Sequence, residues 1–205
     1  MKPLRRLLLA ALVAILLAAL PPLWAAPVEL RVTDPAGRPL AGAVVFLESA
    51  EARQAAKPLP LIDIVQADKA FVPAVTVVTP GTAVRFPNRD TVRHHVYSIS
   101  PVKSFELKLY VGTPASPVVF DKPGVAVLGC NIHDQMVAWV VIVETPWFGQ
   151  TASDGRWRLA DVPPGSYRLR TWHPGLAVGA PAADQPLRVE AGGAQALVRL
   201  EGVSP

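Results

Sequence analysis

Apolar residues in this chain fall in short runs that are separated by turns rich in proline and glycine. Short runs of alternating or β-branched apolar residues are typical of β-strands. The chain contains 22 prolines, and a proline in the interior of a helix breaks it, so only Ser49 to Lys57 is compatible with a helix. The sequence therefore predicts an all-β protein of sandwich type. The expected strands are Val28 to Thr33, Ala43 to Leu47, Ala74 to Thr79, Thr82 to Phe86, His95 to Ile99, Val118 to Phe120, Val125 to Leu128, Val137 to Val143, Arg156 to Leu159, Tyr167 to Thr171 and Ala196 to Leu200.

The N-terminal segment 1–25 has the organisation of a secretory signal. A basic start at residues 2–6 precedes an unbroken apolar run from Leu7 to Leu20, and residues 21–25 end in small side chains. The apolar run is shorter than the roughly 20 residues of a membrane-spanning helix. We therefore expect cleavage after Ala25 and a periplasmic or secreted protein, which would associate with a membrane only if the signal is not cleaved.

The charge balance gives no sign of a nucleic-acid-binding surface. The whole chain has 20 basic and 16 acidic residues. Three of the basic residues, Lys2, Arg5 and Arg6, belong to the expected signal, so the rest of the chain is close to neutral. It contains no cluster of lysines and arginines that would follow a phosphate backbone, and we expect no nucleic-acid partner.

The segment from Cys130 to Met136 contains the only cysteine and the only methionine other than Met1. Together with His133 it offers a thiolate, an imidazole and a thioether, a donor set that suits copper cycling between Cu(I) and Cu(II) if a second histidine joins it. A lone cysteine in an exported chain forms no internal disulfide, and metal binding would keep its sulfur as a thiolate. The simpler alternatives are a buried structural thiol and a core methionine.

The second histidine is expected to be His94 or His95. Successive side chains of a strand point to opposite faces, so Val92, His94 and Val96 share one face, and His95 lies on the other, more polar face. This alternation favours His94 as the inward-facing ligand.

Several motifs between about residues 61 and 144 resemble the cupredoxins. Phe71-Val72-Pro73, Gly81-Thr82 and Asn88 precede His94-His95-Val96 as in the approach to that family's first copper ligand, and Pro123-Gly124-Val125 leads into the cysteine loop. The short Cys-x-x-His-x-x-Met spacing is most similar to that of the amicyanins. The family's first strand is missing from this stretch, and we expect either Val28 to Thr33 or Ala43 to Leu47 to take its place.

The resemblance implies a cupredoxin Greek-key β-sandwich that holds one type 1 (blue) copper ion. In that family the ligand histidine is followed by one polar residue and then valine, so the implied ligands are His94, Cys130, His133 and Met136. His95 is the alternative ligand or, in the position that hydrogen-bonds the ligand loop, a group that orients it. Asn88 and Asn131 are either further hydrogen-bonding groups of the site or ordinary turn residues.

Two other blocks, at residues 32–45 and 151–170, consist of short strands joined by turns that contain proline and glycine. The second block has an Asp-Gly turn at Asp154-Gly155 and a Pro-Gly turn at Pro164-Gly165. Both blocks resemble a carboxypeptidase regulatory-like β-sandwich, although generic hairpins are the alternative. The resulting domain division is a signal peptide at 1–25, a regulatory-like sandwich from 26–57 plus 146–203, and a cupredoxin domain at 58–145 inserted between the two pieces. His173 falls in the regulatory-like part and is expected to be structural.

The functional interpretation is an exported blue copper protein that carries single electrons and is not an enzyme. A copper enzyme needs an open coordination position or a second copper centre, for which the sequence offers no ligands. The alternative is copper delivery without electron transfer, which favours exposed clusters of methionine and histidine that this chain lacks. The chain has no Cys-x-x-Cys-His haem motif, so we expect a separate redox partner such as a c-type cytochrome or a quinoprotein dehydrogenase. The amicyanin-like spacing points to methylamine utilisation without fixing that partner.

Overall fold

The structure is a computed structural model that describes residues 26–203. The predicted signal peptide, residues 1–25, and its expected cleavage after Ala25 therefore lie outside the described residues. The fold is all-β, as predicted, and its one described helix is α2 (Ala50–Ala55), inside the segment expected to tolerate a helix. Within residues 26–203, no helix has both the length and the apolar character needed to cross a membrane.

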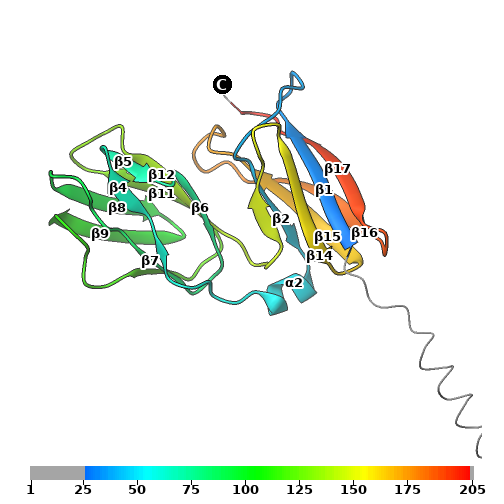
Figure 1. The fold of residues 1–205 in the computed structure, drawn as a ribbon, viewed down its shortest axis with the longest axis horizontal. Helices are drawn as coiled ribbons and strands as arrows, with labels where there is room; N and C mark the ends of the chain where they lie inside the picture. The colour runs from blue at the N-terminus through cyan, green and yellow to red at the C-terminus, as the bar shows by residue number, and fades with distance from the viewer. Residues whose placement is uncertain (1–25, 204–205) are drawn as a thin grey trace, which may run out of the picture.

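The strands form two groups that lie beside each other (Figure 1). Every strand pair in residues 26–203 joins two members of one group. The first group, here called the flanking sandwich, contains β1 (Ala26–Thr33), β2 (Val44–Glu48), β13 (Phe148–Gln150), β14 (Arg156–Val162), β15 (Gly165–Trp172), β16 (Ala183–Val189) and β17 (Ala194–Arg199). The second, the central sandwich, contains β3 (Ile62–Asp63), β4 (Val65–Ala67), β5 (Ala70–Val72), β6 (Val75–Val78), β7 (Thr82–Arg85), β8 (His94–Ser100), β9 (Lys103–Tyr110), β10 (Val118–Phe120), β11 (Gly124–Cys130) and β12 (Val137–Ile142).

The flanking sandwich consists of one sheet in the order β14-β1-β17 and another in the order β13-β2-β15-β16. Its strands come from both ends of the described chain, because β1 pairs antiparallel with β14 and parallel with β17. Alternate residues point inward, so that Val28, Leu30 and Val32 of β1 are buried against Leu47 and Leu169 of the opposite sheet.

The central sandwich packs a sheet in the order β10-β7-β3 against a sheet in the order β6-β12-β11-β8-β9, with the hairpin β4-β5 at its side. Its core contains Phe86, Phe120, Leu128 and Val140, all almost fully buried. The site described below is at one end of this sandwich, where β11 ends and β8 begins.

The strands β11 and β12 are apolar on both faces, and the structure explains why. Ala126 and Leu128 of β11 face the core of the central sandwich. Val125 on the same strand and Trp139 on β12 pack on the opposite side against an interface cluster made of Val44, Phe46, Val141, Val143 and Trp172. The flanking sandwich therefore covers the outer face of this sheet, and a strand buried on both faces carries a continuous apolar run.

Trp139 also lies at this interface, where the centroid of its ring is 6.3 Å from that of Trp172. An ion pair at the rim, with 3.0 Å between Arg53 Nε and Glu144 Oε2, is exposed and adds little to stability. Trp139 thus contributes to the contact between the two sandwiches, on the face of the sheet opposite to that of the Cys130 side chain.

Each expected strand overlaps a strand of the structure, but six short or polar ones were not predicted: β3, β4, β5, β9, β13 and β16. In β16, Pro186 pairs with Arg168 at the edge of a sheet, where the missing N–H of proline is tolerated. The expectation that β1 or β2 would supply the first strand of the central sandwich is wrong. Both pair within the flanking sandwich, and β3 pairs with β7 instead.

We expect Trp172→Ala to lower the free energy of unfolding by about 3–5 kcal/mol, because it removes a large side chain from the interface cluster. Trp172 is only 4% exposed, whereas Leu197, on the outer face of β17, is 64% exposed, so Leu197→Ala should change stability by no more than about 0.5 kcal/mol. Urea unfolding followed by far-ultraviolet circular dichroism measures both. Equally small losses in the two variants would show that the interface does not stabilise the fold.

Candidate metal centre

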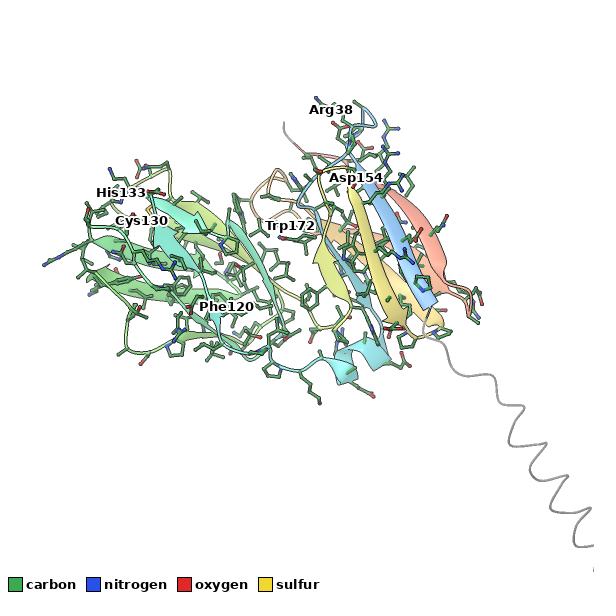
Figure 2. All side chains as sticks on the ribbon, in the orientation of Figure 1. Arg38, Phe120, Cys130, His133, Asp154 and Trp172 are labelled. Carbon is green, nitrogen blue, oxygen red and sulfur yellow. The ribbon has the colours of Figure 1, made fainter. Side chains whose placement is uncertain are left out.

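Three side-chain donors converge at one end of the central sandwich: His94 at the start of β8, Cys130 at the end of β11, and His133 in the loop that follows. His94 Nδ1 and His133 Nδ1 are 3.2 Å apart. Cys130 Sγ lies 3.8 Å from His94 Nδ1 and 3.7 Å from His133 Nδ1. Figure 2 shows Cys130 and His133 together at the end of this sandwich that also carries the hairpin β4-β5.

The triangle formed by these donor atoms has the size of a metal site. With these three distances as sides, the circle through the two nitrogens and the sulfur has a radius of about 2.1 Å. This radius is the distance from an ion at its centre to each donor, and it is close to ordinary metal–nitrogen distances and slightly below metal–sulfur distances. A single ion in the plane of the triangle would therefore reach all three donors with little rearrangement. A trigonal set of two histidines and one cysteine is the equatorial arrangement of blue-copper sites.

The loop between Cys130 and Met136 is closed by its own backbone. The amide of Met136 donates to the carbonyl of His133 at 2.9 Å, and the amide of Cys130 donates to the carbonyl of Met136 at 3.2 Å. Met136 is 1% exposed and belongs to the same core cluster as Cys130. The structure thus brings His94, Cys130 and His133 together and places Met136 in the same core cluster as Cys130, while the role of Met136 as an axial ligand stays a prediction.

The two adjacent histidines have different environments. His94 is fully buried, whereas the His95 side chain is partly exposed, with its Nε2 2.8 Å from Glu106 Oε1. From His94 onward the side chains of β8 alternate between the two faces as predicted. Val92 lies before β8 begins and is exposed rather than inward-facing. The ligand loop is bonded to the backbone of His95, whose carbonyl accepts from the amide of Asn131 at 3.1 Å.

Asn88 organises the segment that leads to His94. Its side-chain Nδ2 donates to the carbonyls of Val92 and Tyr110, at 2.8 and 3.0 Å, and its Oδ1 accepts from the amide of Asp90 at 2.9 Å. Asn88 is only 6% exposed. These bonds fix the turn before β8 and attach it to the end of β9, so Asn88 acts on the site through the backbone.

Tyr110 links the same region to the core. Its hydroxyl donates to the carbonyl of Phe86 at 2.7 Å and accepts from Gln66 Nε2 at 2.5 Å. Burial raises the pKa of the Tyr110 phenol to about 12, so it stays protonated and remains a donor at neutral pH. The unpredicted strands β4 and β9 thus help to hold the segment that carries the first histidine.

Asp90 is a residue of the site that the sequence analysis missed. Its Oδ2 lies 2.7 Å from His94 Nε2, on the side of the ring away from Cys130. Partial burial raises the pKa of Asp90, but the hydrogen bonds from His94 and from the amides of Lys69 and Asp68 outweigh this effect and hold it below the ordinary value. The spacing of four residues between Asp90 and His94 was the available signal in the sequence.

Two other residues fall outside the site. His173 donates from Nε2 to the carbonyl of Ala41 at 3.2 Å and accepts at Nδ1 from the amide of Gly175 at 3.0 Å. Both ring nitrogens have backbone partners, which is the structural role expected for His173. Gly129, just before Cys130, permits a close approach of Tyr97, because a Cβ at this position would lie 2.9 Å from the Tyr97 ring.

Parts of the chain are similar to solved structures of copper proteins. A Cu-containing nitrite reductase from Thermus scotoductus shares 25% identity over 43% of this chain and 23% of its own, with a TM-score of 0.38. A purple cupredoxin from Nitrosopumilus maritimus shares 21% over 40% of this chain and 99% of its own (TM-score 0.36). A reduced Cu(I) form of an amicyanin variant shares 19% over 48% of this chain and 98% of its own (TM-score 0.36).

This chain spans less than a quarter of the nitrite reductase chain. No protein-family model and no curated protein matches it. With TM-scores below 0.5, these similarities assign no ligand to this chain.

We expect His94→Ala to abolish stoichiometric Cu(II) binding, because it deletes one of three converging donors. His95→Ala should retain the site, with at most the roughly 10- to 100-fold loss in affinity seen for groups that only orient a ligand. Isothermal titration calorimetry of both variants with Cu(II) measures the difference in affinity. Loss of binding in His95→Ala alone would exchange the two assignments.

Proposed function

We propose that this protein is an exported copper protein that carries single electrons between redox partners. The supporting observation is the triangle of His94 Nδ1, Cys130 Sγ and His133 Nδ1, whose sides of 3.2 to 3.8 Å fit one metal ion. His94, Cys130 and His133 would hold the ion, and Met136 would be its weak axial donor. Bound copper would supply a one-electron couple between Cu(I) and Cu(II).

The donor set favours copper over harder metal ions. A thiolate and a thioether are soft ligands, and two imidazoles suit both oxidation states of copper. Magnesium and calcium take oxygen ligands, whereas the converging group consists of two histidines and one cysteine, and the Asp90 carboxylate faces the far nitrogen of His94. Zinc remains the chemical competitor, and the strong colour of a copper–thiolate bond distinguishes the two.

The environment of the donors supports electron transfer over catalysis. His94, Cys130 and Met136 are at most 4% exposed, so these three side chains are shielded from bulk water, and of the ligand triangle only His133 is partly exposed. The core around Cys130 is closely packed, with Phe86 and Leu128 among its members. A rigid set of ligands needs little rearrangement when the charge of the ion changes.

His133 is the proposed exit for electrons. Unlike His94 it is partly exposed, and the neighbouring Ile132 is 48% exposed. A ligand with one edge at the surface brings the metal close to a docked protein. We propose a c-type cytochrome or a quinoprotein dehydrogenase as that partner, in the periplasm or outside the cell.

The division into domains is also a proposal: a copper-binding domain at 58–145, inserted into a carboxypeptidase regulatory-like sandwich from 26–57 plus 146–203. The strand pairing supports it, because β1 pairs with β14 and β17 across the whole central segment. The flanking sandwich would then act as a scaffold that covers the outer face of the copper-binding sheet.

We expect the mature protein to take up one equivalent of Cu(II) and to show an intense thiolate-to-copper absorption in the visible range. Cys130→Ser should lose this absorption completely, because an alcohol oxygen does not replace a thiolate as the source of the charge-transfer band. Visible and electron-paramagnetic-resonance spectra of both proteins test this. A variant that keeps the colour would refute the assignment of Cys130.

We expect the copper-loaded protein to hold its metal in both oxidation states. After reduction in the presence of a Cu(I) chelator, it should retain copper and reoxidise reversibly with a c-type cytochrome as acceptor. Copper delivery, the competing function, requires easy loss of ligands. Rapid transfer of Cu(I) to the chelator, with no reversible redox wave in voltammetry, would favour delivery and contradict electron transfer.

A further inference from the structure

Asp90 contacts the ring nitrogen of His94 that faces away from the proposed metal. His94 is fully buried, with its Nδ1 directed at Cys130 and His133 and its Nε2 2.7 Å from Asp90 Oδ2. A neutral imidazole has one N–H and one free lone pair. Since a carboxylate only accepts hydrogen bonds, this contact places the proton on Nε2 and leaves the lone pair of Nδ1 for a metal ion.

The carboxylate of Asp90 is itself held in place from the other side. Its Oδ1 accepts from the amide of Asp68 at 2.7 Å, and its Oδ2 accepts from the amide of Lys69 at 3.0 Å. Both donors are in the turn of the hairpin β4-β5, where Asp68 and Lys69 have positive φ angles of 53° and 55°. This left-handed turn points two consecutive N–H groups at one carboxylate.

Strand β4 of the same hairpin is attached to the segment between β7 and β8 that precedes His94. The amide of Gln66 on β4 donates to the carbonyl of Pro87 at 2.8 Å, and the amide of Arg89 donates to the carbonyl of Gln66 at 2.9 Å. The hairpin, Asp90 and His94 therefore form a continuous chain of hydrogen bonds. Asp90 has three N–H partners in all, two from the hairpin and one from the buried ring.

We propose that Asp90 is a positioning residue that, through the hairpin β4-β5, sets the tautomer and orientation of His94 and favours Cu(II) over Cu(I) at the site. Only the preference for Cu(II) over Cu(I) rests on the proposed copper function. Carboxylates that hydrogen-bond the far nitrogen of a ligand histidine fix the ring and make it a more basic donor. Their negative charge also stabilises the more positively charged ion, because attraction grows with charge in a buried site.

The first test needs no metal. In the metal-free, reduced wild-type protein, ¹⁵N NMR of the imidazole should show His94 as the Nε2–H tautomer. Asp90→Ala removes the acceptor, so the dominance of this tautomer should be lost, and Asp90→Asn should have a smaller effect of the same sign. Asp63→Ala is the matched control, because Asp63 is a carboxylate of the same sandwich that pairs with Arg85 at 2.7 Å instead.

The second test uses copper. Asp90→Ala should lower the affinity for Cu(II) by about 10- to 100-fold, the usual effect of removing a group that orients a ligand. The affinity for Cu(I) should fall less, so the reduction potential should rise. Asp63→Ala should leave both affinities and the potential unchanged. A purely structural role of Asp90 would lower thermal stability without altering the tautomer or the ratio of the two affinities.

The outcomes separate this inference from the proposed function. An Nδ1–H tautomer in the wild-type protein overturns the positioning role, even if no variant folds. A folded Asp90→Ala or Asp90→Asn variant that keeps the wild-type tautomer and the wild-type ratio of Cu(II) to Cu(I) affinity also overturns it. Copper binding by the wild-type protein would still stand in that case. Failure of the wild type to bind copper, together with a tautomer that depends on Asp90, contradicts the copper function and leaves the positioning role intact.

Discussion

The register between β8 and β11 is the constraint on which the site depends. Cys130 lies opposite Val96 in this antiparallel pair, so the two side chains share a face, and His94, two residues before Val96, lies on that same face. A shift of the pairing by one residue would turn His94 to the outside and bring His95 inward, because side chains alternate along a strand. The geometry of the donor triangle is therefore a consequence of sheet pairing rather than of local sequence.

That register is protected by burial on both sides of the sheet. Leu128 and Val140 pack into the core of the central sandwich, while Val125 and Val141 pack against the flanking sandwich. With apolar residues on both faces of β11 and β12, the alternation of apolar and polar residues does not specify which face turns inward. The bulky interface residues Trp139 and Trp172 restrict the packing and supply the shape that the pattern lacks. The flanking sandwich thus contributes to the precision of a site that it does not touch.

The hydrogen bonds around His94 form a polar network at the edge of an apolar core. A buried polar group is costly unless it has a partner, and the side chains nearest the ring have partners: His94 bonds Asp90, Asp90 bonds the hairpin, and Asn88 bonds three backbone groups. Such a network fixes one arrangement of the ring, with Nδ1 directed at Cys130 and His133.

The amino-acid sequence by itself determined the all-β class, most of the long strands and the chemistry of the donors. Strand periodicity and proline content are local properties, and Cys130, His133 and Met136 are close together along the chain, so no tertiary information was needed to group them. Alternation also favoured His94 over His95, and the structure buries His94 in the donor triangle. The edge strand β9 was missed although Phe105 and Leu107 alternate with charged residues, which is the pattern of a strand with one exposed face.

Only the tertiary structure decided what surrounds the donors. The hairpin β4-β5 turns at Asp68 and Lys69 without glycine, so the usual turn signal was missing, and its bond to Asp90 joins residues about 20 positions apart. Likewise, the two-sided burial of β11 and β12 depends on a sandwich built from both ends of the described chain. These contacts depend on which surfaces meet after folding, and local sequence patterns carry no information about that choice.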